Sequence, residues 1–336
     1  MKILHISDLH VGPYNPNLDN LETVRDFCVD RKNGLDVVVC SGDLMDRCLT
    51  KEQIEQMAKA YNFLTSNVGS KEDISFEELL DQLKKADLSG LPEELRKGLR
   101  AASRDYKEVE QEFDRHANNE YRRIFKIFRQ LPQQVVVCPG NWDSTNFFDY
   151  AEDMNIHRTI RDINGLRFAG YGDSKDMAPM PPTRTIGFSD KSLFGFLRSV
   201  DPDVAITHVP PYEEVREELI GDKVKRKKIY RGNFAARAFL ESERPILYLC
   251  GHHHDDRGFY LVNPGKAETL VNNAGNLGSY EHSNKDGTFT EVELDEDKRI
   301  VSATPYRIMD GKVKTAQART GYDLRNLKQA EANAPK

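Results

Sequence analysis

Short runs of consecutive apolar residues alternate along the chain with amphipathic segments. Runs of four or five residues, each one nearly or wholly apolar, lie at residues 3–6, 36–40, 135–138, 203–207 and 247–250. Nearly unbroken runs of this length are typical of strands that are buried on both faces of a sheet. Segments with apolar residues at helical spacing lie between them, at residues 19–32, 192–198 and 233–242. Strand and helix in alternation predict an α/β protein with largely parallel sheets.

We expect a strand pair within residues 163–172, near the middle of the chain. The C-terminal third adds strands without intervening helices, at 269–273, 287–294 and 298–307. The last ~25 residues show neither helical nor strand periodicity, which is typical of a surface extension. These patterns predict a core formed by residues 1–49 and 132–310, followed by a C-terminal tail at 311–336.

Residues 50–131 differ in composition from the segments on either side. They are rich in Glu, Lys, Leu, Gln and Arg, and their apolar spacing predicts helices at 51–66, at 75–86 and near 100–130. We interpret this region as a helical insertion between two core strands, serving as a cap or an oligomer contact. A solvated helical face without chemistry is the alternative.

Composition narrows the functional classes. The 336 residues carry a net charge of -6, with a pI near 5.9, which argues against a general nucleic-acid coat. No apolar run approaches the ~20 residues that span a bilayer, and the first residues are too polar for a signal peptide. The five cysteines form no C-x-x-C pair, so we expect buried, reduced thiols. Together these features predict a cytoplasmic protein.

Polar residues of the kinds that bind metal ions follow five of the predicted strands. In chain order they are Asp8 and His10, Asp43, Asn141, His208, and His252 with His254. Because functional sites in α/β folds lie at the carboxyl ends of the strands, we expect these side chains to converge. Five such loops are hard to explain as solvated surface.

Two carboxylates, one amide and four imidazoles are too many ligands for a single ion. Two ions ~3.5–4 Å apart, bridged by a carboxylate, suit phosphoester hydrolysis, in which a bridging hydroxide attacks phosphorus in line. Oxygen and nitrogen donors without thiolate favour manganese, with iron, zinc, cobalt or nickel as alternatives.

The ordered motifs resemble those of the calcineurin-like metallophosphoesterases. They are D-x-H at residue 8, G-D-x-x-D-R at 42, G-N-x-D at 140, His208, and G-H-x-H at 251. The resemblance covers residues 1 to about 308 apart from the helical region, and sequences near residues 207–212, 232–239 and 270–275 are similar to the Icc-like branch. It implies a four-layer αββα sandwich of two packed mixed sheets flanked by helices.

The same resemblance implies roles for individual residues. Asp8, His10, Asp43 and His254 would hold one ion. Asp43 would bridge to a second ion held with Asn141, His208 and His252. We expect Asp43, Asn141 and His253 to act in catalysis. Arg47, Trp142 and Asn141 are the expected substrate contacts.

One departure from the family pattern lies at Trp142. The family usually has histidine there, and that histidine helps to protonate the leaving group. An indole cannot deliver a proton near neutral pH, which predicts lower rates on poor leaving groups unless His253 or His282 substitutes. Trp142 could instead stack on a substrate ring or pack over the metal loop. Relatives with other residues here are typically associated with phosphodiesters, which favours a phosphodiesterase.

Two other functions stay open at this point. Residues 223–231 hold six basic residues in nine, which suits a polyanionic substrate or a solvated loop. Together with the helical insertion, these basic residues suggest a second possible function, a repair-type nuclease that acts on DNA or RNA. A non-catalytic interaction module is the third reading. The expected partner is otherwise a phosphate-ester small molecule or a nucleotide.

Overall fold

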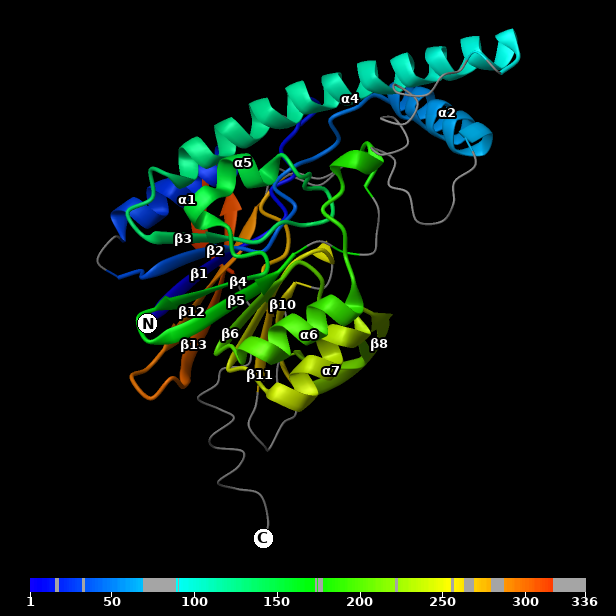
Figure 1. The fold of residues 1–336 in the computed structure, drawn as a ribbon. Helices are drawn as coiled ribbons and strands as arrows, with labels where there is room; N and C mark the ends of the chain where they lie inside the picture. The colour runs from blue at the N-terminus through cyan, green and yellow to red at the C-terminus, as the bar shows by residue number, and fades with distance from the viewer. Residues whose placement is uncertain are drawn as a thin grey trace.

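The computed structural model describes residues 1–15, 18–31, 34–68, 89, 91–172, 174, 178–220, 223–254, 257–262, 269–278 and 287–316. Within these ranges the chain forms two six-stranded sheets and a separate two-stranded sheet. Figure 1 shows the two large sheets packed face to face, with helices on the outer side of each. The expected α/β fold with two mixed sheets and flanking helices is confirmed.

The first sheet has the order β14-β13-β12-β1-β2-β3. Its parallel half contains β1 (Lys2–Ile6), β2 (Val37–Cys40) and β3 (Gln134–Val137). Its antiparallel half contains β12 (Thr288–Leu294), β13 (Ile300–Met309) and β14 (Lys312–Thr315). The first three apolar runs seen in the sequence thus form the parallel half, which is buried on both faces.

The second sheet has the order β10-β11-β9-β6-β5-β4. Its four central strands are parallel: β5 (Leu166–Tyr171), β6 (Val204–Thr207), β9 (Leu247–Cys250) and β11 (Thr269–Asn273). The two edge strands run antiparallel to their neighbours: β4 (Thr159–Ile163) and β10 (Gly258–Val262).

Helices cover the outer face of each sheet. On the first sheet lie α1 (Asp19–Asp30), α5 (Phe147–Ala151) and the C-terminal half of α4 (Glu93–Phe128). On the second lie α6 (Asp190–Val200) and α7 (Phe234–Glu243). Three buried apolar clusters fill the interfaces between these layers. Short 3-10 turns occur at Glu152–Met154 and Pro182–Arg184.

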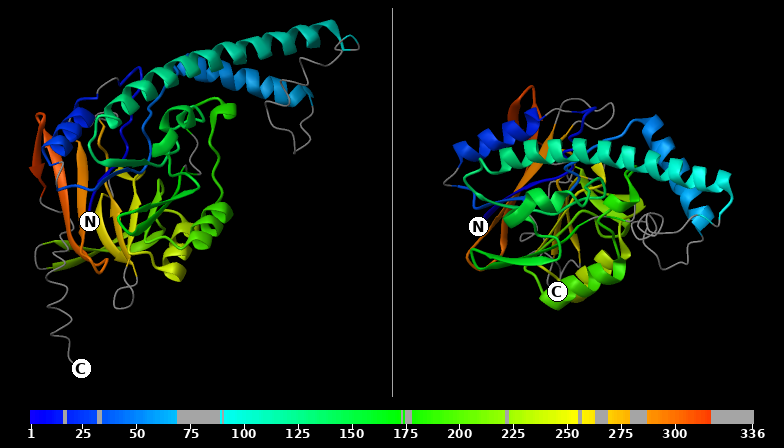
Figure 2. Two further views of the ribbon diagram at one scale, coloured as in Figure 1. Left: turned by 60° about the vertical axis from the view of Figure 1, so that its left-hand side comes forward. Right: turned by 45° about the horizontal axis from the view of Figure 1, so that its top comes forward.

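The helical region 50–131 lies between β2 and β3. Helix α2 (Lys51–Val68) packs along the N-terminal half of α4, and the pair projects beyond the sheets (Figure 2). The C-terminal half of α4 buries Tyr121, Phe125 and Phe128 completely in the cluster that covers the first sheet. That half therefore acts as the crossover helix between parallel strands. The division of the chain into a core and a helical insertion stays a prediction.

Several boundaries differ from the sequence expectations. A solvated loop was one of the two possibilities for the basic stretch 223–231. The stretch instead forms strand β8 (Lys223–Arg231), which pairs with β7 (Glu213–Ile220). Strand β14 continues the first sheet into residues 312–315, inside the predicted tail, because it pairs with β13 through a tight turn at Asp310 and Gly311. The predicted helix 75–86 lies outside the described residues. Within the described ranges, no helix has the length and apolarity needed to cross a bilayer.

Candidate metal centre

The loops that follow β1, β2, β3, β6 and β9 meet at one edge of the two sheets. The first two loops continue the pairing of their strands, since the Asp8 N–H donates to Gly42 O (2.9 Å) and the His10 N–H donates to Asp43 O (3.0 Å). Asp8, His10 and Asp43 have positive φ angles of 55°, 47° and 51°, and His252 has one of 69°. Such backbone strain is typical of functional loops, where the surrounding structure fixes the conformation.

One group of ligand-type side chains contains Asp8, His10 and His254. His254 Nε2 lies 3.0 Å from Asp8 Oδ1 and 3.2 Å from His10 Nε2. Burial opposes ionisation of Asp8, but hydrogen bonds from His10 and His254 outweigh it and hold its pKa well below the ordinary value. Asp8 and His10 are buried, whereas His254 is partly open to solvent. This group thus offers an ionised carboxylate oxygen and two imidazole nitrogens.

A second group contains Asp43, His208 and His252. His208 Nε2 lies 3.1 Å from Asp43 Oδ2, 3.2 Å from His252 Nδ1 and 3.0 Å from Asn141 Oδ1. The same Asp43 oxygen is 3.8 Å from His10 Nε2 in the first group. Asp43 therefore lies between the two groups, and Asn141 adds its amide oxygen to the second.

The environment of His208 shows that a cation fits here. Its Nδ1 lies 2.9 Å from Ser41 O, so Nδ1 carries a proton and donates it to that carbonyl. Nε2 then faces two oxygen acceptors, Asp43 Oδ2 and Asn141 Oδ1. Burial alone would lower the pKa of His208, but the Asp43 carboxylate outweighs it and raises that pKa to about 10. The lone pair of His208 Nε2 would repel the lone pairs of these two oxygens unless a positive charge lay between them. Either a proton or a metal ion can supply that charge.

Two glycines allow the loops to approach closely. A Cβ on Gly140 would lie 2.1 Å from Asp43 Oδ1 and 2.3 Å from the Asp43 backbone nitrogen. A Cβ on Gly251 would lie 1.9 Å from Ser7 Oγ and 2.2 Å from Asp8 Oδ2. Each glycine therefore belongs to the construction of one ligand group.

Asp143 and Tyr121 are site residues whose roles the sequence did not reveal. Asp143 accepts hydrogen bonds from the backbone N–H groups of Gly140 (2.7 Å), Leu44 (3.3 Å) and Met45 (3.3 Å). It thereby ties the loop of Asp43 to the loop of Asn141. Burial, aided by the charge of Asp43, raises the pKa of Asp143 to about 7. Asp143 stands in the G-N-x-D motif, which was a signal for its importance.

Tyr121 connects helix α4 to these loops. Its hydroxyl donates to Asp143 Oδ1 (3.1 Å) and accepts from the Ser144 N–H (2.8 Å). Burial raises the pKa of Tyr121 well above 10, so the hydroxyl remains a donor. Tyr121 lies 20 residues upstream of Asn141 and belongs to no motif. In the sequence it cannot be distinguished from the other residues of the apolar face of its helix.

The remaining predicted site residues surround the two groups. The backbone N–H of Trp142 donates to Asp43 Oδ1 (2.9 Å), and the indole ring lies edge-on to His10 with centroids 6.1 Å apart. Trp142 also packs against the buried cluster, in agreement with the packing alternative. The His253 ring adjoins that of His252, at 4.7 Å between centroids. Arg47 follows Asp46 in the Asp43 loop and is partly buried. His282 lies outside the described residues.

Comparisons with known proteins agree with the family resemblance of the sequence motifs. The sequence matches the family model described as calcineurin-like phosphoesterase over residues 1–85 and 105–256. None of the curated proteins matches the chain. One crystal structure aligns with a TM-score of 0.54 at 16% identity, covering 94% of this chain and 98% of its own.

Two further solved structures are similar at lower scores. A novel archaeal phosphodiesterase aligns with a TM-score of 0.35 at 13% identity, covering 94% of this chain and 100% of its own. The NAD nucleotidase of Haemophilus influenzae aligns with a TM-score of 0.39 at 11% identity, covering 99% of this chain and 56% of its own. At 16% identity, the alignment with a TM-score of 0.54 shows the fold alone. The family match covers well over half of the chain. The protein is a member of the calcineurin-like phosphoesterase family.

Proposed function

We propose that this protein is a two-metal phosphodiesterase. The observation that carries the proposal is the position of Asp43 between the two ligand groups, with one carboxylate oxygen 3.1 Å from His208 Nε2 and 3.8 Å from His10 Nε2. A shared carboxylate of this kind suits a pair of divalent ions, for which manganese is our first choice.

The protein residues divide into two ligand sets. Asp8, His10 and His254 would hold the first ion, Asn141, His208 and His252 the second, and Asp43 would contribute to both. When bound, the ions would polarise the phosphoryl oxygens and activate a water molecule for attack on phosphorus. The protein keeps the ligands in place before binding, since Ser41 O fixes the His208 ring and Asp143 ties together the loops of Asp43 and Asn141.

Asn141 would orient the substrate as well as bind metal. Its Oδ1 faces His208 Nε2, so its amide nitrogen is the group that can donate to a phosphoryl oxygen. Arg47, on the Asp43 loop, is our choice for a second phosphate contact because a guanidinium can donate two parallel hydrogen bonds.

The choice of a diester rests on Trp142. A monoester presents a phosphoryl group with two negative charges and one organic substituent, which favours additional cations at the site. The indole beside His10 offers instead an apolar ring, which suits the second organic substituent of a diester. Because the indole cannot protonate a leaving group near neutral pH, we expect good leaving groups to react best. His253, next to His252, is the candidate replacement acid.

The test compares two esters with the same leaving group. The Mn²⁺-loaded protein should hydrolyse bis-p-nitrophenyl phosphate faster than p-nitrophenyl phosphate, and the His208→Ala variant should hydrolyse neither. The Trp142→His variant should gain activity on alkyl esters, while a His253→Gln variant tests the replacement acid. Faster hydrolysis of the monoester, or full activity of His208→Ala, would contradict the proposal.

A nuclease is the alternative substrate class, suggested by the basic strand β8. Fluorescently labelled single- and double-stranded DNA, incubated with the same Mn²⁺-loaded protein, separates the two readings. Cleavage of DNA with affinity that falls steeply as salt rises would favour the nuclease. Cleavage of small diesters alone would favour a small-molecule phosphodiesterase.

A further inference from the structure

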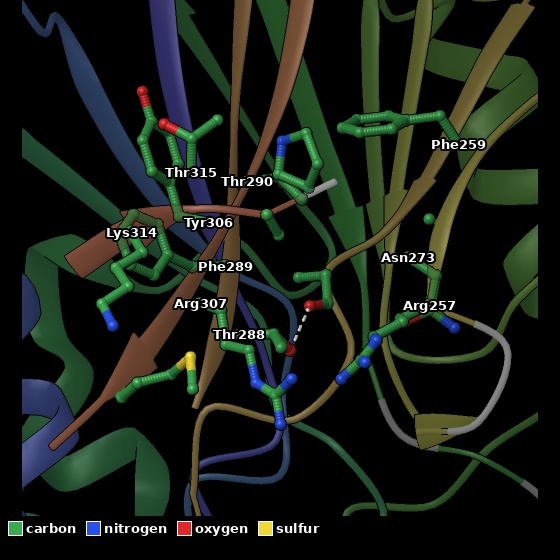
Figure 3. Close-up of a pocket in the computed structure, with 15 residues that line it drawn as sticks. Arg257, Phe259, Asn273, Thr288, Phe289, Thr290, Tyr306, Arg307, Lys314 and Thr315 are labelled. Atoms are coloured by element: carbon green, nitrogen blue, oxygen red, sulfur yellow. Dashed lines mark hydrogen bonds between the residues drawn. The ribbon is translucent and has the colours of Figure 1, made fainter. Parts of the chain in front are cut away.

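A cavity of about 350 Å³ opens between the two sheets, at the end where β10 and β11 face β12, β13 and β14. It lies close to the metal centre but shares none of its ligand residues. Asn273, in its wall, donates from Nδ2 to the carbonyls of Gly251 (3.3 Å) and His253 (3.1 Å). Asn273 therefore separates the cavity from the loop that carries His252 and His254. Figure 3 shows the side chains that line it.

A row of polar and cationic residues crosses one wall of the cavity. Thr288 on β12 is the register partner of Arg307 on β13, and Arg307 is in turn the partner of Lys314 on β14. Directly opposed residues of neighbouring strands project from the same face of a sheet. Arg307 and Lys314 therefore lie side by side on this wall, which concentrates positive charge there.

Arg257, directly before β10 of the opposite sheet, completes this cationic end. Its side chain and that of Arg307 point toward one another in Figure 3. Gly275, with a φ of +80°, lets Arg257 lie close to Thr288, because a Cβ there would lie 2.6 Å from Thr288 Oγ1 and 2.9 Å from Arg257 Cβ. Among the described residues that line the cavity are three cationic side chains and no carboxylate. The lining therefore favours a negatively charged occupant.

The other end of the cavity is apolar. Phe259 lies at the opposite end of the view from the two arginines in Figure 3, and Pro305 also lines the wall. Thr290, between these ends, has its hydroxyl 2.6 Å from Asn272 Oδ1 and is fixed by that contact. A ligand that fills this volume would place an anionic group at one end and a ring or other apolar group at the other.

We propose that this cavity binds a small organic phosphate, with the phosphate between Arg257 and Arg307 and the organic part against Phe259 and Pro305. A volume near 350 Å³ is at the lower end of the range for small-molecule sites and suits a molecule the size of a nucleoside monophosphate. Paired guanidinium groups are the donors best matched to phosphate oxygens. The site is independent of the metal centre, and Asn273 links it to the loop that carries His252 and His254.

Calorimetric titration of the full-length protein tests this proposal, with AMP, adenosine and inorganic phosphate as the probes. The protein is first stripped of metal by chelation, and the His208→Ala variant is titrated in parallel, so that binding at the metal centre is excluded whether or not the protein is a phosphodiesterase. We expect AMP to bind with one saturable site and more tightly than either phosphate or adenosine. Arg307→Gln and Arg257→Gln should each weaken that binding at least about tenfold.

Arg237→Gln is the matched control, since Arg237 is partly exposed on α7 and pairs with Glu241 at 2.7 Å, outside the cavity lining. It should leave AMP binding unchanged. Circular dichroism and thermal unfolding of each variant separate loss of binding from loss of fold. Absence of saturable binding by both AMP and phosphate would overturn the proposal. Binding that is unaffected by both cavity arginine variants, or lost in His208→Ala, would overturn it as well.

Discussion

The hydroxyl of Tyr121 offers a test of how the structure supports its metal loops from a distance. The Tyr121→Phe variant removes one oxygen atom from a fully buried ring. That oxygen makes two hydrogen bonds, donating to Asp143 Oδ1 at 3.1 Å and accepting from the Ser144 N–H at 2.8 Å. The ring itself keeps its stacking contact with Tyr150. The change therefore isolates the hydrogen bonds from the packing.

The expected cost follows from these two bonds. Leaving the buried Ser144 N–H without a partner costs about 1–3 kcal/mol, and a hydrogen bond to a charged carboxylate contributes about 1.5–3 kcal/mol. Because the pKa of Asp143 is about 7, the carboxylate is ionised at pH 8, where the measurement is made. We therefore expect Tyr121→Phe to lower the free energy of unfolding by about 3 kcal/mol, a large part of a typical domain's stability.

Urea unfolding of the metal-free protein measures this change. Tyr106→Phe is the matched control, because Tyr106 lies on the same helix and its hydroxyl bonds to Thr183 Oγ1 at a longer 3.3 Å. The control should lose about 1 kcal/mol or less. Equal losses in the two variants would show that the hydroxyl of Tyr121 contributes no more than an ordinary hydrogen bond. Metal affinity should also fall in Tyr121→Phe, since Asp143 holds the loops of Asp43 and Asn141.

Three further predictions concern the loops, the pH and the metal. Gly140→Ala should abolish metal binding and hydrolysis, because the added Cβ would collide with the Asp43 backbone. Gly195→Ala is the control and should keep both, because there is open space around Gly195. Metal content and diester hydrolysis are the two measurements. Burial lowers the pKa of His157 to about 4, so the unfolded chain binds the extra proton below pH 6.5, and His157 should contribute a loss of stability of about 3 kcal/mol as the pH drops from 6.5 to 4, beside that of His5, whose pKa burial also lowers to about 4. In urea titrations His157→Gln should remove about 3 kcal/mol of this dependence on pH, and an unchanged dependence would contradict the role of His157. Adding Mn²⁺ to the chelated protein should raise its melting temperature in scanning calorimetry, and a melting temperature unaffected by saturating metal would contradict a preformed site.

The sequence predicted the parallel strands and the convergence of the ligands for one physical reason. Strands buried on both faces must be apolar throughout, so residues such as Asp8 and His208 stand out where each strand ends. The carboxyl ends of parallel strands meet at one edge, which brings these residues together although they are 200 positions apart.

The features that the sequence did not reveal depend on contacts between distant segments. Strand β10 lies at a sheet edge, and β14 pairs with β13 at residues that carry no alternating pattern. Tyr121 resembles any core aromatic until helix α4 is placed over the Asp143 loop. The hairpin of β7 and β8 has so many charged residues that hydrophobic periodicity could not indicate it.

The cavity was equally beyond reach of the sequence. Arg307 and Lys314 become neighbours only through the register of β13 with β14, and Arg257 joins them only when the two sheets pack. Single basic residues in three separate segments carry no local signal, because a solvated surface charge has the same appearance.

Metal content measured together with diester hydrolysis decides whether the site is a dinuclear catalytic centre. We expect two Mn²⁺ ions per chain in the wild-type protein after loading and removal of excess metal, and hydrolysis of bis-p-nitrophenyl phosphate. His254→Ala and His208→Ala, each altering one ligand group, should each retain about one ion and lose hydrolysis. A wild-type protein that binds a single ion, or variants that keep both ions and full activity, would contradict a dinuclear centre built from these residues.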